Sequence, residues 1–141
     1  MSKRSPTKKA KDEAWKYFSI FIRTRDCLKT TGNPETGVCI TCPRKYDFKG
    51  LQAGHFIGGR HNSNLFSEKG VHGQCKYCNL NLKGNVLEYR RKVIDLYGDG
   101  ADIELENEAR KIVKYTLKDY LEIAEKYKLK TKELLENDFV I

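Results

Sequence analysis

The sequence lacks any run of about 18 apolar residues, the length that a membrane-spanning helix requires. Its first residues, Met1–Lys11, also lack the apolar stretch of a secretory signal peptide. These absences predict an intracellular protein that does not cross a membrane, and in that compartment thiols stay reduced. We therefore expect the five cysteines to be metal ligands or free thiols rather than disulfides.

Acidic residues are scarce relative to basic ones, with 19 Asp and Glu against 27 Lys and Arg and a net charge of +8. Such a charge attracts polyanions, nucleic acid before anionic membranes. With 141 residues, 39% of them hydrophobic, the chain is expected to form one domain around a small core. A core of that size often needs a covalent or metal staple.

The order of patterns along the chain predicts a basic arm followed by a single mixed domain. Residues 1–11 are expected to form a flexible basic arm that either contacts phosphate or is simply solvated, and residues 12–141 the domain, which ends in a helical extension at about 102–137. Internal repeats are absent. The expected elements are a helix at 12–25, short strands at 38–40 and 50–56, an irregular loop around 58–64, and helices at 85–97, 103–113 and 116–137.

Two Cys-x-x-Cys pairs, Cys39/Cys42 and Cys75/Cys78, have the spacing of zinc knuckles. A gap of two residues lets both thiolates of a pair reach one ion, and two pairs complete a tetrahedron. Such an ion would be structural, because four cysteines leave no open position for substrate. Four unrelated thiols are the alternative, while a thioredoxin-like redox role fits poorly, since neither pair sits in a strand–helix unit. Cys27 lies outside the pattern and is expected to be a free, partly buried thiol.

Six motifs follow one another in a fixed order along the chain. They are Phe21–Asp26, Cys39-Ile40-Thr41-Cys42, Ala53-Gly54-His55-Phe56, Val71–Asn79, Gly84-Asn85 and Tyr89-Arg90. This ordered set resembles the NinG family of lambdoid phages, also called Rap, whose members are recombination endonucleases acting on branched DNA. The resemblance covers roughly residues 14–105. More distantly, the chain is similar to the phage endonuclease VII group, in which Cys-x-x-Cys-Asn follows a strand that bears the catalytic histidine.

This resemblance implies an α+β fold with a zinc-bound ββα-metal core, the His-Me finger of HNH nucleases, and flanking N-terminal and C-terminal helices. It implies a DNA endonuclease that uses Mg²⁺ or Mn²⁺. His55 would be the general base, since the pKa of a histidine lies near working pH. Asn79 would open the short helix and bind the catalytic ion through its amide oxygen. The alternatives are a hydrogen-bonded surface or core histidine at 55 and a simple helix cap at 79.

The sequence departs from the family pattern at Gly54, where many His-Me fingers place Asp or His. The second protein ligand of the catalytic ion is therefore open. His72 is the first candidate, either as a ligand or as a phosphate contact, and Gln52 is a poor one. The middle Asn of HNH motifs would fall near Gly70 and is absent. His61 lies in a Gly/Asn-rich loop and is expected to be an incidental solvated residue.

Four basic residues near the candidate site, Arg60, Lys83, Arg90 and Arg91, are expected to line the path of the DNA. The resemblance implies branched recombination intermediates, such as Holliday junctions or D-loops, as substrates. It also implies a phage protein that acts in the cytoplasm of the bacterial host. A junction-cutting enzyme would most simply be a symmetric homodimer, with the C-terminal helix as the interface.

Two other classes of protein would also explain parts of the sequence. A non-catalytic zinc-containing module that binds nucleic acid explains the cysteines and the charge. A helical interaction protein with an architectural zinc knuckle explains the cysteines alone, and it predicts no salt-sensitive affinity for DNA.

Overall fold

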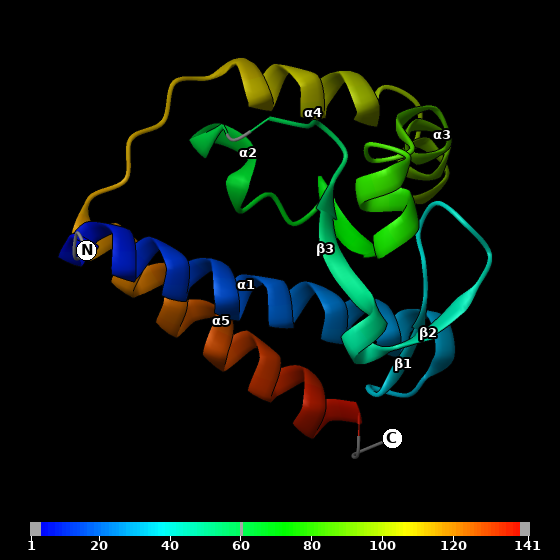
Figure 1. Ribbon diagram of the computed structural model, residues 1–141, viewed down its shortest axis with the longest axis horizontal. Helices are drawn as coiled ribbons and strands as arrows, with labels where there is room; N and C mark the ends of the chain where they lie inside the picture. Colours follow the sequence, from blue (N-terminus) through cyan, green and yellow to red (C-terminus); the bar gives the residue numbers. More distant parts are fainter. Residues whose placement is uncertain (1–3, 60, 139–141) are drawn as a thin grey trace.

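The computed structural model describes residues 4–59 and 61–138. Two long helices, α1 (Pro6–Thr31) and α5 (Leu117–Asp138), lie side by side along one side of the molecule (Figure 1). Helices α2 (Asn62–Leu65), α3 (Val86–Tyr97) and α4 (Ala101–Arg110) lie on the other side of α1. No helix within the described ranges combines the length and the apolarity that crossing a bilayer requires.

The strands form two small antiparallel pairs. Strand β1 (Thr36–Val38) pairs with β2 (Lys45–Asp47), and after a short 3₁₀ turn β3 (Leu51–His55) pairs with β4 (Val71–Cys75). A π-helical turn, η2 (Tyr77–Asn81), follows β4 directly. The mixed α+β class with small antiparallel sheets is therefore confirmed.

Helix α1 begins earlier than the sequence analysis predicted. Residues 6–11, expected in a flexible arm, are helical, because Ser5 caps the helix by accepting a hydrogen bond from the Lys8 N–H (3.1 Å) and Pro6 occupies the first turn. The helix continues to Gly32, whose positive φ of 75° suits a glycine C-cap. Residues 1–3 of the expected arm lie outside the described residues.

The later helices match their predicted positions more closely. Thr116 caps α5 as expected, since its Oγ1 accepts from the Asp119 N–H (3.1 Å) while the Asp119 carboxylate accepts from the Thr116 N–H (2.8 Å). Gly98 ends α3 as predicted. The predicted side-chain cap at Asn85 is wrong: this residue is left-handed, and its amide instead donates to the Thr41 carbonyl (3.2 Å) and weakly to the Cys78 sulfur (3.8 Å).

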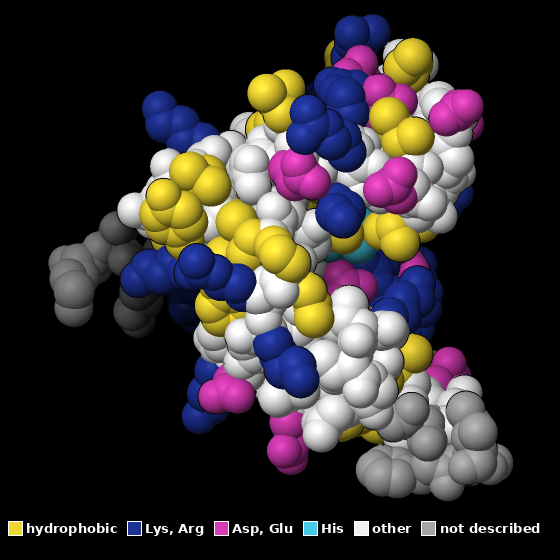
Figure 2. Space-filling view, turned by 90° about the vertical axis from the view of Figure 1, so that its right-hand side faces the viewer, with side chains coloured by type: hydrophobic (Ala, Val, Ile, Leu, Met, Phe, Trp, Pro, Cys, Tyr) yellow, Lys and Arg dark blue, Asp and Glu magenta, His cyan; other side chains and the backbone are white. Residues whose placement is uncertain are grey.

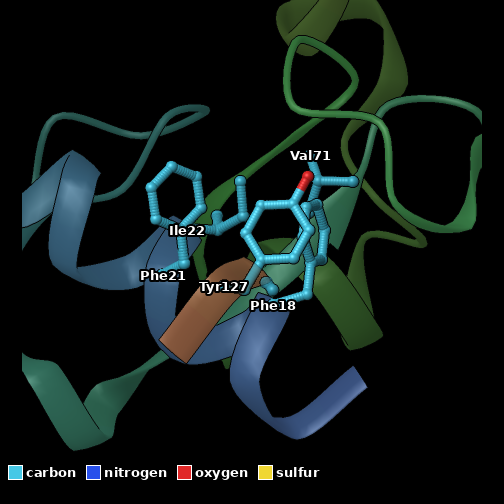
Figure 3. Close-up of a cluster of buried hydrophobic side chains, with 6 residues drawn as sticks. Phe18, Phe21, Ile22, Val71 and Tyr127 are labelled. Carbon is cyan, nitrogen blue, oxygen red and sulfur yellow. The ribbon is translucent and has the colours of Figure 1, made fainter. Parts of the chain in front are cut away.

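The main core joins α1, α5 and the β3–β4 pair. Phe18 and Ile22 of α1 are fully buried, and Tyr127 of α5 packs edge-on against Phe18 with ring centroids 4.8 Å apart. Val71 of β4 completes this cluster (Figure 3). Because β3 and β4 are anchored in this core, their ends are held in fixed positions, and the candidate site residues lie at those ends.

Candidate functional site

The four cysteines of the two Cys-x-x-Cys pairs converge on one point. Their sulfur atoms all lie within 4.8 Å of one another, and the Cys42 and Cys75 sulfurs are 3.8 Å apart. A tetrahedral zinc with Zn–S bonds of about 2.3 Å separates its sulfurs by about 3.8 Å, so this donor set could hold a structural metal such as zinc. Cys27 stays outside the group as a free, buried thiol.

Backbone amides are already aimed at these sulfurs. The Cys75 N–H donates to the Cys39 sulfur (3.3 Å), and the Cys78 N–H donates to the Cys75 sulfur (3.4 Å). Burial alone would raise the pKa of the Cys75 thiol, but this N–H and the neighbouring side-chain donors outweigh burial and lower it to about 7. The Cys78 amide therefore favours the thiolate of Cys75, the form that binds metal, whereas burial raises the pKa of the Cys42 and Cys78 thiols.

His55, the last residue of β3, is held on the side of the strand that faces α1. Its ring stacks on Trp15 with centroids 5.3 Å apart and planes 14° apart. Its Nε2 lies 3.2 Å from the Leu65 carbonyl oxygen. Burial lowers the pKa of His55, which the Leu65 and Asn64 carbonyls offset only in part, so the imidazole is neutral at pH 7.

A pocket of 320 Å³ opens beside His55. Lys8 and Lys11, which we had assigned to the flexible arm, line it from the first turns of α1. Trp15, to which we gave only a core role, forms another part of the wall. Ser5 and Pro6 are the sequence signal that would have predicted this part of the pocket wall. A helix that begins at Pro6 places residues 8, 11 and 15 on one side of α1. The full lining is Lys8, Lys11, Asp12, Trp15, His55, Gly59, Asn62 and Leu65.

Asn79 lies in η2 and faces the opposite side of the β3–β4 pair from His55. Its Nδ2 donates to Gln52 Oε1 (2.8 Å), and successive side chains of a strand point to opposite faces. We expected the His55 and Asn79 side chains to lie together at one site. The structure instead places them on opposite faces of the β3–β4 pair. Among the described residues, β3 pairs with β4 alone.

His72 is a structural residue rather than the ligand or phosphate contact that we expected. It is 3% exposed, and both ring nitrogens are taken: Nδ1 lies 3.2 Å from the Tyr89 hydroxyl and Nε2 2.8 Å from the Tyr97 hydroxyl. The Tyr89 hydroxyl in turn donates to the Gly54 carbonyl (2.6 Å). No nitrogen of His72 remains for a metal ion.

Of the four residues predicted to contact DNA, Arg90 and Arg91 are paired with acidic side chains. Arg90 pairs with Asp102 (2.5 Å) and Glu106 (2.6 Å), which fastens α3 to α4, so its predicted phosphate contact is not supported. Arg91 is exposed and paired with Glu88 (2.9 Å), and Lys83 is exposed at a positive φ of 52°. Arg60 lies outside the described residues. On the side that carries α3, Lys and Arg side chains alternate with Asp and Glu (Figure 2).

These observations define a small mixed α+β protein with a four-cysteine cluster suited to metal and a histidine pocket under a basic helix. The profile of the family described as "Bacteriophage Lambda NinG protein" matches residues 2–137. The chain therefore belongs to the NinG family.

Curated relatives agree with this assignment. Protein ninG of Escherichia phage 933W is 29% identical over 123 residues, which is 86% of this chain and 56% of the relative. Protein ninG of Salmonella phage P22 is 28% identical over 126 residues (89% and 57%), and that of Escherichia phage lambda 28% over 123 residues (86% and 55%). The chain thus spans little more than half the length of these relatives. No solved structure matches.

Proposed function

We propose that this chain is a metal-dependent endonuclease that hydrolyses phosphodiester bonds in DNA, with His55 as the general base. The hydrogen bond between His55 Nε2 and the Leu65 carbonyl carries the proposal. A carbonyl oxygen can only accept, so Nε2 holds the ring proton and Nδ1 keeps its lone pair. That lone pair is the group that takes a proton from an attacking water.

The surroundings of His55 suit this task in two further ways. Its lowered pKa keeps the ring neutral at pH 7, and the stacked Trp15 fixes the plane of the ring. Lys11 in the same pocket places positive charge where a phosphate of the DNA backbone would enter, while Lys8 is paired with Asp12 of the pocket wall (2.9 Å). The net charge of +8 acts in the same direction.

Two metals would have separate roles. Zinc in the four-cysteine cluster would be structural, since its four thiolates leave no open position. A catalytic Mg²⁺ or Mn²⁺ would stabilise charge on the scissile phosphate. Asn79 suits such an ion because its Nδ2 is committed to Gln52, which leaves its Oδ1, a hard donor, for the ion.

We further propose that β3, β4 and η2 form a His-Me finger and that the substrate is branched DNA formed during phage recombination in the host cell. This step rests on the resemblance of the motifs around His55 and Asn79 to the family. A homodimer remains the simplest assembly for cutting a junction symmetrically.

The test is a nicking assay with the zinc-loaded chain on linear, nicked, single-stranded and branched DNA, with Mg²⁺, with Mn²⁺ and with a chelator. His55→Ala should lower cleavage by roughly 10²–10⁴-fold while DNA affinity and zinc content stay unchanged. His61→Ala is the matched control, because His61 is exposed and its side chain makes no capping hydrogen bond.

The outcomes separate the three classes of protein. Binding that weakens with salt, without nicking of any substrate by the wild type, would identify a non-catalytic nucleic-acid-binding module. Absence of salt-sensitive DNA binding would identify an interaction protein. Cleavage that survives in His55→Ala would reject His55 as the base.

A further inference from the structure

Gln74, a fully buried residue of β4, has an amide oxygen without a hydrogen-bond partner. Its Nε2 donates to Thr41 Oγ1 (3.0 Å) and to the Gly84 carbonyl (2.9 Å). Because the Gly84 carbonyl can only accept, the orientation of the amide is fixed, and Oε1 must point the other way. A buried acceptor without a partner is costly and calls for an explanation.

The Gln74 oxygen occupies the space of the side chain that residue 54 does not have. A Cβ built on Gly54 would lie 1.9 Å from Gln74 Oε1, so only glycine fits there. The same Cβ position is 3.1 Å from Asn79 Oδ1. Two amide oxygens, Gln74 Oε1 of β4 and Asn79 Oδ1 of η2, therefore lie close to the Cβ position of Gly54. Gly54 directly precedes His55 in the sequence.

We propose that Gln74 Oε1 is the second protein ligand of the divalent ion and replaces, from the neighbouring strand, an oxygen that residue 54 would otherwise supply. Amide oxygens are hard donors of the kind that Mg²⁺ and Mn²⁺ accept. Supplying the ligand oxygen from Gln74 also explains why residue 54 is a glycine. A side chain at position 54 would overlap the Gln74 amide. This inference rests on the proposed function, which requires a divalent ion, and it places that ion on the face of β3 opposite the His55 ring.

The test measures Mn²⁺ alone, bound to the zinc-loaded chain, by electron paramagnetic resonance of the free ion. Gln74→Ala should weaken Mn²⁺ binding by roughly tenfold or more, since even loss of an outer-shell partner costs about that much. Gln74→Met, which fills the space without an oxygen, should weaken it equally and guards against collapse of the site in the alanine variant.

Two further variants distinguish a ligand from a structural tether. Gly54→Asp combined with Gln74→Ala moves the oxygen to the other strand and should restore Mn²⁺ affinity to the wild-type value or above. Thr41→Val removes one outer-shell hydrogen bond of the Gln74 amide while leaving Oε1 in place, so it should weaken Mn²⁺ binding by roughly tenfold. The same substitution should have no such effect in the double variant, which has no Gln74 amide.

Wild-type Mn²⁺ affinity in folded, zinc-containing Gln74→Ala or Gln74→Met would overturn the inference, as would failure of the double variant to regain affinity. If the wild type cuts DNA while Mn²⁺ binding is indifferent to Gln74, this inference fails and the proposed function stands. If Mn²⁺ binding depends on Gln74 but no DNA is cut, the proposed function fails and the ion site stands.

Discussion

Replacing one cysteine of the four-sulfur cluster should unfold the part of the chain around it. The buried group there consists of Cys27, Cys39, Cys75 and Cys78 with Leu51 as its one large aliphatic side chain. Apolar burial in this group is therefore small. Structural zinc contributes about 10–16 kcal/mol in small zinc domains, which is comparable to the roughly 5–15 kcal/mol by which a whole domain is stable.

Cys78→Ser should therefore lose the metal ion and abolish a single cooperative melting transition. Cys27→Ser is the matched control, because Cys27 is equally buried but lies outside the cluster. Burying a hydroxyl in its place should cost about 1–3 kcal/mol, which lowers Tm by several degrees in a chain of this size, at about 2–4 °C per kcal/mol. That variant should keep its zinc.

The assay combines metal analysis of the purified protein with thermal unfolding followed by circular dichroism, with and without a chelator. The reasoning is refuted if Cys78→Ser keeps one zinc per chain and melts within a few degrees of the wild type. It is also refuted if Cys27→Ser loses zinc as readily as Cys78→Ser, because the four-sulfur geometry would then not determine the metal content.

Two further predictions concern the buried polar residues. Burial lowers the pKa of His72 to about 4, below the value near 6.5 of an unfolded chain. The stability that neutral His72 contributes to the fold is therefore fully present above pH 6.5 and is lost as pH falls toward 4. Between pH 7 and 5 the wild type should lose about 2 kcal/mol more than His72→Gln in urea unfolding, and equal losses would contradict this. Asp26→Ala should cost about 3–5 kcal/mol by leaving the buried Arg25 without its carboxylate; a cost no larger than that of Asp26→Asn would show that the charge is unimportant.

The features that the sequence predicted well are those set by local spacing. Two Cys-x-x-Cys pairs bring four sulfurs together because ligand geometry requires it, and Thr116 caps α5 through residues three positions apart. Strand β4 was missed although Val71, Gly73 and Cys75 alternate with His72 and Gln74. It contains a single β-branched residue and a glycine, so its composition does not favour a strand.

The arrangement around His55 depends on contacts that no spacing rule contains. Its hydrogen-bond partner is a backbone carbonyl in the short segment after Gly59, and its stacking partner Trp15 comes from a helix forty residues earlier in the chain. The role of His72 was misjudged for the same reason. Its tyrosine partners lie in α3, and a histidine between two hydroxyls has the same sequence appearance as a free one.

The position of the site depends on how α1 holds β4. The Asp26 carboxylate accepts a hydrogen bond from the Gly73 N–H (2.7 Å), and the Arg25 guanidinium donates to the Val71 carbonyl (2.9 Å). These contacts fix the outer edge of β4 residue by residue, and a slip of one position would turn Gln74 away from Gly54. The buried ion pair is therefore best explained as a device that sets strand register. The amide oxygen of Gln74 and the thiolate of Cys75, on opposite faces of the same strand, both depend on that register.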